Sequence, residues 1–119
     1  MKIRICAVGR LRSGPAAEAD ALSRAVPAGD VLVALDERGR AVSSPELADR
    51  LADWRDEGRP GVTFVIGGAD GLSRELRRRA DLALSFGPMV WPHMLARVML
   101  AEQLYRAASI LSGSPYHRA

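Results

Sequence analysis

The end of the chain carries the residues best suited to acid-base chemistry. Tyr116, His117 and Arg118 place a phenol, an imidazole and a guanidinium side by side, directly behind a long apolar segment. Histidine gains and loses a proton near neutral pH, and arginine binds phosphate or stabilises negative charge. These side chains either complete a site, on this subunit or on another, or form an ordinary terminus of mixed polarity.

A second polar group lies in the segment 93–112, where the pattern predicts a helix. His93 stands at its start, and Glu102 and Arg106 are one helical turn apart, where they can pair. Such a pair is more often a surface salt bridge than a catalytic element. Two histidines and one cysteine without a close cluster make a protein-bound metal unexpected.

These residues must be positioned by alternating strands and helices, which the apolar pattern predicts. Strands are expected over 3–8, 31–35, 62–66 and 82–86, and helices over 16–25, 45–57, 73–80 and 93–112. A loop is expected over 36–39, and Ser44 is expected to cap the helix that begins at Pro45. The alternation predicts an α/β fold with a mainly parallel sheet flanked by helices, in one domain over 1–119.

Ligands of open parallel sheets bind beyond the carboxyl ends of the strands. Three segments lie there, namely Leu35 with Asp36, the segment 67–71 and the segment 87–92. Glycines at 67, 68 and 71 let a ligand approach the main chain closely. They match neither a dinucleotide fingerprint nor a P-loop, so a structural turn and a ligand loop fit them equally well.

Composition narrows the function classes. The chain has 119 residues, of which 48% are hydrophobic and 26% charged, as in a soluble globular domain. Only 5% are aromatic, which leaves little material for RNA binding by rows of stacked rings. Of 17 basic residues only Lys2 is lysine; the arginines suit phosphate, but such a bias also follows from a GC-rich genome. One cysteine, no leader and no membrane-spanning run predict a cytoplasmic protein.

The predicted helix over 93–112 is apolar around most of its circumference. A helix of this kind needs two surfaces to bury against. We expect one of these surfaces to be the sheet and the other to be a second subunit.

Four ordered motifs support a family resemblance. The segments 65–72, 91–93, 97–107 and 115–118, with Ile3, Cys6, Ala7, Val8 and Gly9 at the start, resemble the ribosomal large subunit methyltransferase H family. Its members are small SPOUT-class enzymes that methylate N3 of a pseudouridine in 23S ribosomal RNA. The resemblance covers essentially the whole chain from Ala16 onward.

The resemblance implies a homodimer that binds S-adenosylmethionine in a trefoil knot formed by the C-terminal half. Carried over by position, the cofactor pocket comprises Leu35, Gly67, Gly68, Gly87, Pro88, Met89, Val90, Trp91 and Pro92. The expected catalytic residues are His93, Glu102, Arg106, Tyr116, His117 and Arg118. Either His117 or His93 would assist proton loss, while Arg106 and Arg118 would stabilise the anion or grip phosphate. No metal is needed.

The chain departs from the family in its first half, where relatives have an additional helix and strand. Here Gly14-Pro15 runs directly into Ala16-Ala17, so either the sheet is reduced or a stretch is missing. The expected substrate is 23S ribosomal RNA in the assembled ribosome, with free RNA as the alternative. The alternative is a cofactor-binding or ribosome-associated module without catalysis. A metabolic enzyme using a nucleotide is disfavoured because the phosphate-loop residues are absent.

Overall fold

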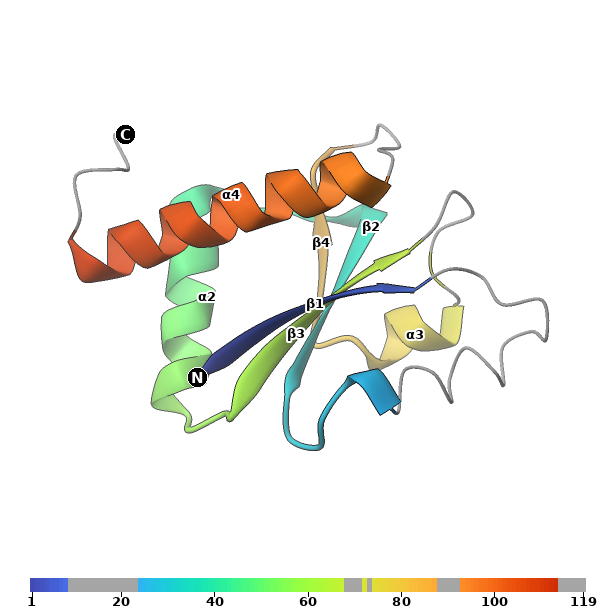
Figure 1. Cartoon of the computed structure of the whole chain (residues 1–119), viewed down its shortest axis with the longest axis horizontal. Helices are drawn as coiled ribbons and strands as arrows, with labels where there is room; N and C mark the ends of the chain where they lie inside the picture. Colours follow the sequence, from blue (N-terminus) through green and yellow to red (C-terminus); the bar gives the residue numbers. More distant parts are fainter. Residues whose placement is uncertain (9–23, 68–71, 73, 88–92, 114–119) are drawn as a thin grey trace.

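The computed structural model describes residues 1–8, 24–67, 72, 74–87 and 93–113 (Figure 1). Strands and helices alternate along them, in the order β1 (Lys2–Val8), β2 (Val31–Ala41), α2 (Ser44–Asp56), β3 (Gly61–Gly67), α3 (Arg74–Arg79), β4 (Leu82–Ser85) and α4 (His93–Ser112). Of the helix predicted over 16–25, only residues 24 and 25 are described, and both are helical. The junction between Pro15 and Ala16 lies outside the described residues.

The strands of the described part form one four-stranded sheet in the order β1-β3-β2-β4. Every pairing is parallel: β1 with β3, β2 with β3, and β2 with β4. The apolar runs Val31–Ala34 and Val62–Ile66 are buried throughout, as expected for parallel strands covered on both faces. The predicted α/β fold with a mainly parallel sheet is therefore confirmed.

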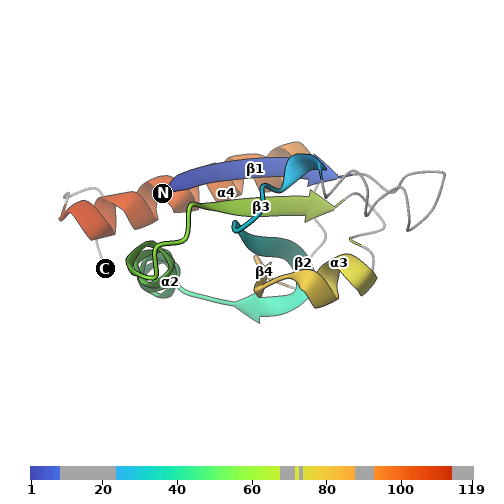
Figure 2. The ribbon, with the colours of Figure 1, turned by 90° about the horizontal axis from the view of Figure 1, so that it is seen from below.

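The helices cover the two faces of the sheet differently (Figure 2). The larger core joins one face of the sheet to α2 and α4, and includes Val33, Phe64, Leu51, Trp54 and Leu100. The smaller core joins the opposite face to α3, and consists of Leu32, Ala34, Val65, Leu72 and Leu76, with Cys6 packed against it. Cys6 is thus a small packing residue, as its place in a strand predicts.

Strand β2 is longer than predicted. We expected it to end at Leu35 and a loop to follow, but it continues to Ala41. Both Leu35 and Arg40 align with Leu84 of β4, so residues 36–39 form a bulge between two paired stretches. A Cβ on Gly39 would lie 2.7 Å from the carbonyl carbon and oxygen of Ala83, so only glycine allows this approach.

Helix α2 begins one residue earlier than predicted. The N-cap is Ser43 rather than Ser44, and Ser44 is already helical. The Ser43 hydroxyl accepts a hydrogen bond from the Glu46 amide, and the Glu46 carboxylate accepts one from the Ser43 amide. The two contacts form a capping box, which decides the boundary in favour of Ser43.

Helix α4 has the predicted bounds and is apolar on two sides. Leu100 and Ala107 are fully buried against the sheet and α2. On the other side Leu95, Val98 and Tyr105 are 50%, 65% and 61% exposed. We call these three residues the outer face of α4. Among the described residues, no helix combines the length and apolar character needed to cross a membrane.

Candidate functional site

A groove of about 620 Å³ lies where β2 and β4 end, between the start of α2 and the middle of α4. Its lining is mostly apolar with a few polar side chains, a mixture typical of small-molecule sites. The lining residues are Ala41, Val42, Ser43, Ser44, Leu47, Leu84, Ser85, Phe86, Gly87, Val98, Met99, Glu102 and Gln103. The groove is thus on the carboxyl side of the sheet, where parallel folds bind ligands.

The groove brings together two residues that the sequence predicts for different roles. Gly87, expected to bind the cofactor, and Glu102, expected to be catalytic, both line it. Gly87 follows β4 directly and has a φ of 111°, a conformation that favours glycine. The two residues come from different elements, so the fold, not sequence proximity, places them together.

Glu102 is held by two neighbours on its own helix. Arg106 donates a hydrogen bond to Glu102 Oε1 over 2.8 Å, and the Gln103 side-chain amide donates one to Glu102 Oε2 over 3.1 Å. The Ser44 hydroxyl in turn donates to Gln103 Oε1 over 2.5 Å. This chain of contacts ties the start of α2 to α4 and orients the carboxylate at the groove wall.

Two other predicted cofactor residues lie on the neighbouring strands. Leu35 is half-buried in β2, aligned with Ile66 of β3 and Leu84 of β4, and packs against the larger core. Gly67 is the last residue of β3 and is half-buried. Neither lines the groove. Gly67 thus ends its strand at the carboxyl side of the sheet, the side on which Gly87 follows β4, whereas Leu35 lies before the bulge of β2.

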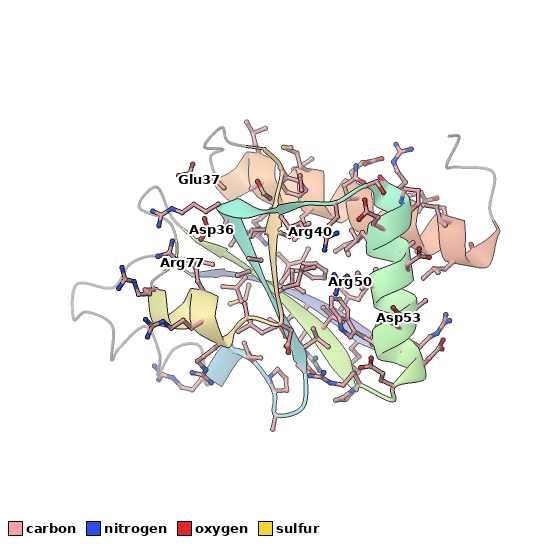
Figure 3. The ribbon with its side chains drawn as sticks, turned by 180° about the vertical axis from the view of Figure 1, so that it is seen from behind. Asp36, Glu37, Arg40, Arg50, Asp53 and Arg77 are labelled. Carbon is pink, nitrogen blue, oxygen red and sulfur yellow. The ribbon has the colours of Figure 1, made fainter. Side chains whose placement is uncertain are left out.

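The bulge of β2 is anchored from the opposite face of the sheet. Asp36, whose side chain is 8% exposed, pairs with Arg77 of α3 over 3.4 Å. The other Asp36 oxygen accepts a hydrogen bond from the Arg38 amide over 2.9 Å. Figure 3 shows Asp36 and Arg77 at the same end of the sheet. The bulge is therefore anchored to α3, and the Ser85 hydroxyl at the end of β4 contacts its Glu37 carbonyl oxygen.

The remaining predicted site residues fall outside the described part. His93 is the first residue of α4, but its side chain is not described. The others outside are Gly68, Pro88, Met89, Val90, Trp91, Pro92, Tyr116, His117 and Arg118. Within the described residues, no group of three or more histidine, cysteine or acidic side chains is arranged to hold a metal.

Sequence reasoning missed Ser44, Gln103 and Ser85 as groove residues. Ser44 was assigned to the cap, whereas the spacing of Ser43 and Glu46 already indicates a capping box that leaves Ser44 available. For Gln103 the sequence offers a weaker indication of a site residue, namely its place beside Glu102. For Ser85 the only indication is its position at the end of a strand, two residues before Gly87.

Comparison with known proteins adds independent information. Residues 12–117 match the family model described as a predicted SPOUT methyltransferase. Three curated relatives, from Dinoroseobacter shibae, Cereibacter sphaeroides and Ruegeria pomeroyi, are 52%, 56% and 50% identical. Each is named ribosomal RNA large subunit methyltransferase H, and each alignment covers 99% of both chains.

Those alignments run over 155 positions, whereas this chain has 119 residues. Some positions of the relatives therefore have no counterpart here, in keeping with the shortened first half that the sequence indicates. The match nevertheless spans nearly the whole chain, and the sheet and helices fit an α/β enzyme. The chain belongs to the SPOUT methyltransferase family and has the resemblance to methyltransferase H that its four motifs predict.

Proposed function

We propose that the protein transfers a methyl group from S-adenosylmethionine to N3 of a pseudouridine in 23S ribosomal RNA, within the assembled ribosome. The observation that carries this proposal is the full-length similarity to relatives named ribosomal RNA large subunit methyltransferase H. The choice of base and atom rests on the resemblance of the motifs. A target inside a large particle would let the ribosome supply recognition surface that a 119-residue chain with a charge of +3 lacks.

The groove supports the proposed donor. Its apolar side chains suit a flat adenine ring. Among the described residues predicted to bind the donor, Gly87 lines the groove, whereas Leu35 and Gly67 would contact the donor beyond that lining. The resemblance implies that the donor is also held by Gly68, Pro88, Met89, Val90, Trp91 and Pro92. When bound, S-adenosylmethionine supplies an electrophilic methyl group on a sulfonium centre.

The chain's own polar residues would prepare the acceptor. Methylation at an imide nitrogen requires that its proton be removed and that the developing anion be stabilised. We assign the first task to His93 or His117 and the second to Arg106 and Arg118. Glu102 would orient Arg106 through the contact that joins them. Tyr116 completes the set at the end of the chain.

A homodimer would complete the site. The outer face of α4 exposes three large apolar side chains in the single chain, a pattern typical of interaction surfaces. We propose that a second copy covers this face and that the terminal residues of each copy reach the other's groove. A single domain over 1–119, with a C-terminal trefoil knot and a cytoplasmic location, completes this proposal.

One observation favours an alternative function. The chain lacks positions that its relatives possess, because 155 aligned positions correspond to 119 residues. If the lost positions carry substrate recognition, the protein is a cofactor-binding or ribosome-associated module without catalysis. The groove would then bind the donor while no methyl transfer takes place.

Methyl transfer to two substrates tests the proposal. Ribosomes from cells without the corresponding methyltransferase, and naked 23S RNA prepared from them, are incubated with the protein and tritiated S-adenosylmethionine, and the product is mapped by mass spectrometry. We expect label in assembled ribosomes at one pseudouridine and little in naked RNA. Donor binding without transfer to either substrate supports the module, and the absence of both rejects the two functions.

A further inference from the structure

The hydroxyl of Ser85 connects three parts of the chain at the end of β4. Ser85 is the last residue of the strand and is 7% exposed. Its Oγ accepts a hydrogen bond from the Gly87 amide over 2.9 Å. It also lies 3.2 Å from the Glu37 carbonyl oxygen and 3.0 Å from that of Gly87, to either of which its single hydrogen can be donated.

The contact with Glu37 joins Ser85 to the bulge of β2, which other contacts hold in place. Glu37 belongs to the bulge of β2, whose first residue, Asp36, is paired with Arg77. At the other end of the bulge, Gly39 lies against the backbone of Ala83, with no room for a Cβ. A hydrogen bond to the Glu37 carbonyl therefore ties the end of β4 to a segment that is fixed on both sides.

The contact with Gly87 holds the backbone just after β4 ends. Gly87 lines the groove and has a φ of 111°, and a Cβ there would meet nothing within 4 Å. Two backbone groups of Gly87 contact the Ser85 hydroxyl: the amide donates to it, and the carbonyl oxygen lies within hydrogen-bond distance of it. These contacts hold Gly87 at the groove wall.

We propose that Ser85 is a positioning residue for the methyl donor: its buried hydroxyl links Gly87 to the β2 bulge and so holds the Gly87 backbone at the groove wall for binding. The inference rests on the proposed function, because it takes the donor as the ligand next to Gly87. Ser85 acts through Gly87 and the bulge and has no chemical role in the transfer.

Direct binding of the donor tests this role. The dissociation constants of S-adenosylmethionine and S-adenosylhomocysteine are measured by calorimetry for the unaltered protein and for S85A, S85T and S109A. Ser109 is the matched control: it is also a buried serine, 5% exposed, but its hydroxyl donates to Tyr105 within α4. S85T keeps the hydroxyl, and threonine, being β-branched, is well suited to a position in a strand.

We expect S85A to weaken binding about ten-fold, as for the loss of a buried hydrogen bond, with S85T and S109A close to the unaltered protein. In methyl transfer, KM for the donor should rise in S85A while KM for ribosomes stays unchanged. If Ser85 only stabilised the fold, S85A would change KM for the donor and KM for ribosomes together, or neither of them. Threonine would then not restore donor binding specifically.

The opposite result is equally clear. Unchanged donor affinity in folded S85A, or an equal loss in S109A, overturns the inference while the proposed function stands. If the unaltered protein does not bind the donor, the proposed function fails first. If S85A does not fold, S85C keeps the volume with a much weaker donor, and normal affinity in that variant overturns the inference.

Discussion

Arg106 Nη2 lies 2.8 Å from Glu102 Oε1 across one turn of α4 and donates a hydrogen bond to it. The other oxygen of Glu102 accepts from Gln103, so both carboxylate oxygens are engaged. The side chains of Arg106 and Glu102 remain 27% and 37% exposed, which leaves part of each accessible to a ligand. Arg106 itself does not line the groove, but its contact with Glu102, which does, orients it one helical turn from the groove wall.

The Glu102–Arg106 pair should therefore matter more for methyl transfer than for stability. We predict that R106A slows single-turnover transfer at least about 10-fold, by removing a charged donor from the reaction. The free energy of unfolding should fall by less than about 1 kcal/mol, because partly exposed pairs contribute little. Rapid-quench assays with ribosomes and chemical denaturation measure the two effects.

The pair Arg55–Asp56 on α2 provides the control for this prediction. Its atoms are 3.2 Å apart and the side chains are 54% and 71% exposed. R55A removes an arginine of the same type from a surface pair outside the groove. It should leave transfer unchanged, and transfer by R106A at the rate of R55A would refute the role given to Arg106.

The anchor of the bulge gives a stability prediction. Asp36 is 8% exposed at its side chain, so R77A leaves a nearly buried carboxylate without its arginine partner. We predict a loss of about 1–3 kcal/mol in the free energy of unfolding. R78A removes an exposed arginine from the same helix and should cost far less. Equal denaturation midpoints for the two variants would show that the Asp36 contact does not stabilise the fold.

Local patterns were sufficient for much of the fold. The predicted helix over 93–112 has the bounds of α4, because a long apolar pattern follows a segment that two prolines interrupt. The buried strand over 62–66 extends by one residue at each end in β3. In both cases the bounds of the element follow from the local sequence, without knowledge of what the element packs against.

The bulge and the groove could not be predicted in this way. The segment 36–39 reads as a loop because it is charged and ends in glycine, and its return to the sheet depends on pairing with β4. The groove needs β2, β4, α2 and α4 together, and no local pattern encodes that juxtaposition. Glu102 and Gly87 could be proposed one by one, but only the fold brings them together.

The capping box of α2 gives a prediction on pH. Hydrogen bonds from the backbone and side chain of Ser43, with the positive charges of Arg40 and Arg50, lower the pKa of Glu46 in the folded protein. A lowered folded pKa means that Glu46 stabilises the fold above its ordinary pKa and that this contribution is lost as pH falls through the folded value. Acid should therefore weaken the helix cap.

Denaturation at several pH values checks the cap. We predict that S43A costs about 1 kcal/mol at neutral pH, and that E46Q reduces the loss of stability on acidification. The control D49N alters an exposed acid on the same helix that makes no capping contact. If E46Q and D49N show the same pH dependence as the unaltered protein, the ionised Glu46 does not contribute through the cap.

The outer face of α4 leads to the last prediction. Val98 is 65% exposed, and Leu95 and Tyr105 beside it are 50% and 61% exposed, although all three are large and apolar. Val98 also lines the groove, whereas Leu95 does not, so the test is made at Leu95. A carboxylate at Leu95 would lie in the proposed interface, where burying an unpaired charge is costly. It would remain hydrated in the single chain, so L95D should be a folded monomer.

Light scattering after size-exclusion chromatography measures this outcome, with R78D as the control that adds a carboxylate to α3 on the opposite face of the sheet. We expect R78D to remain dimeric. Because the terminal residues are proposed to reach the partner's groove, L95D should also lose methyl transfer while its circular dichroism stays unchanged. An L95D protein that is still dimeric places the interface elsewhere, and a fully active monomer shows that one copy contains a complete site.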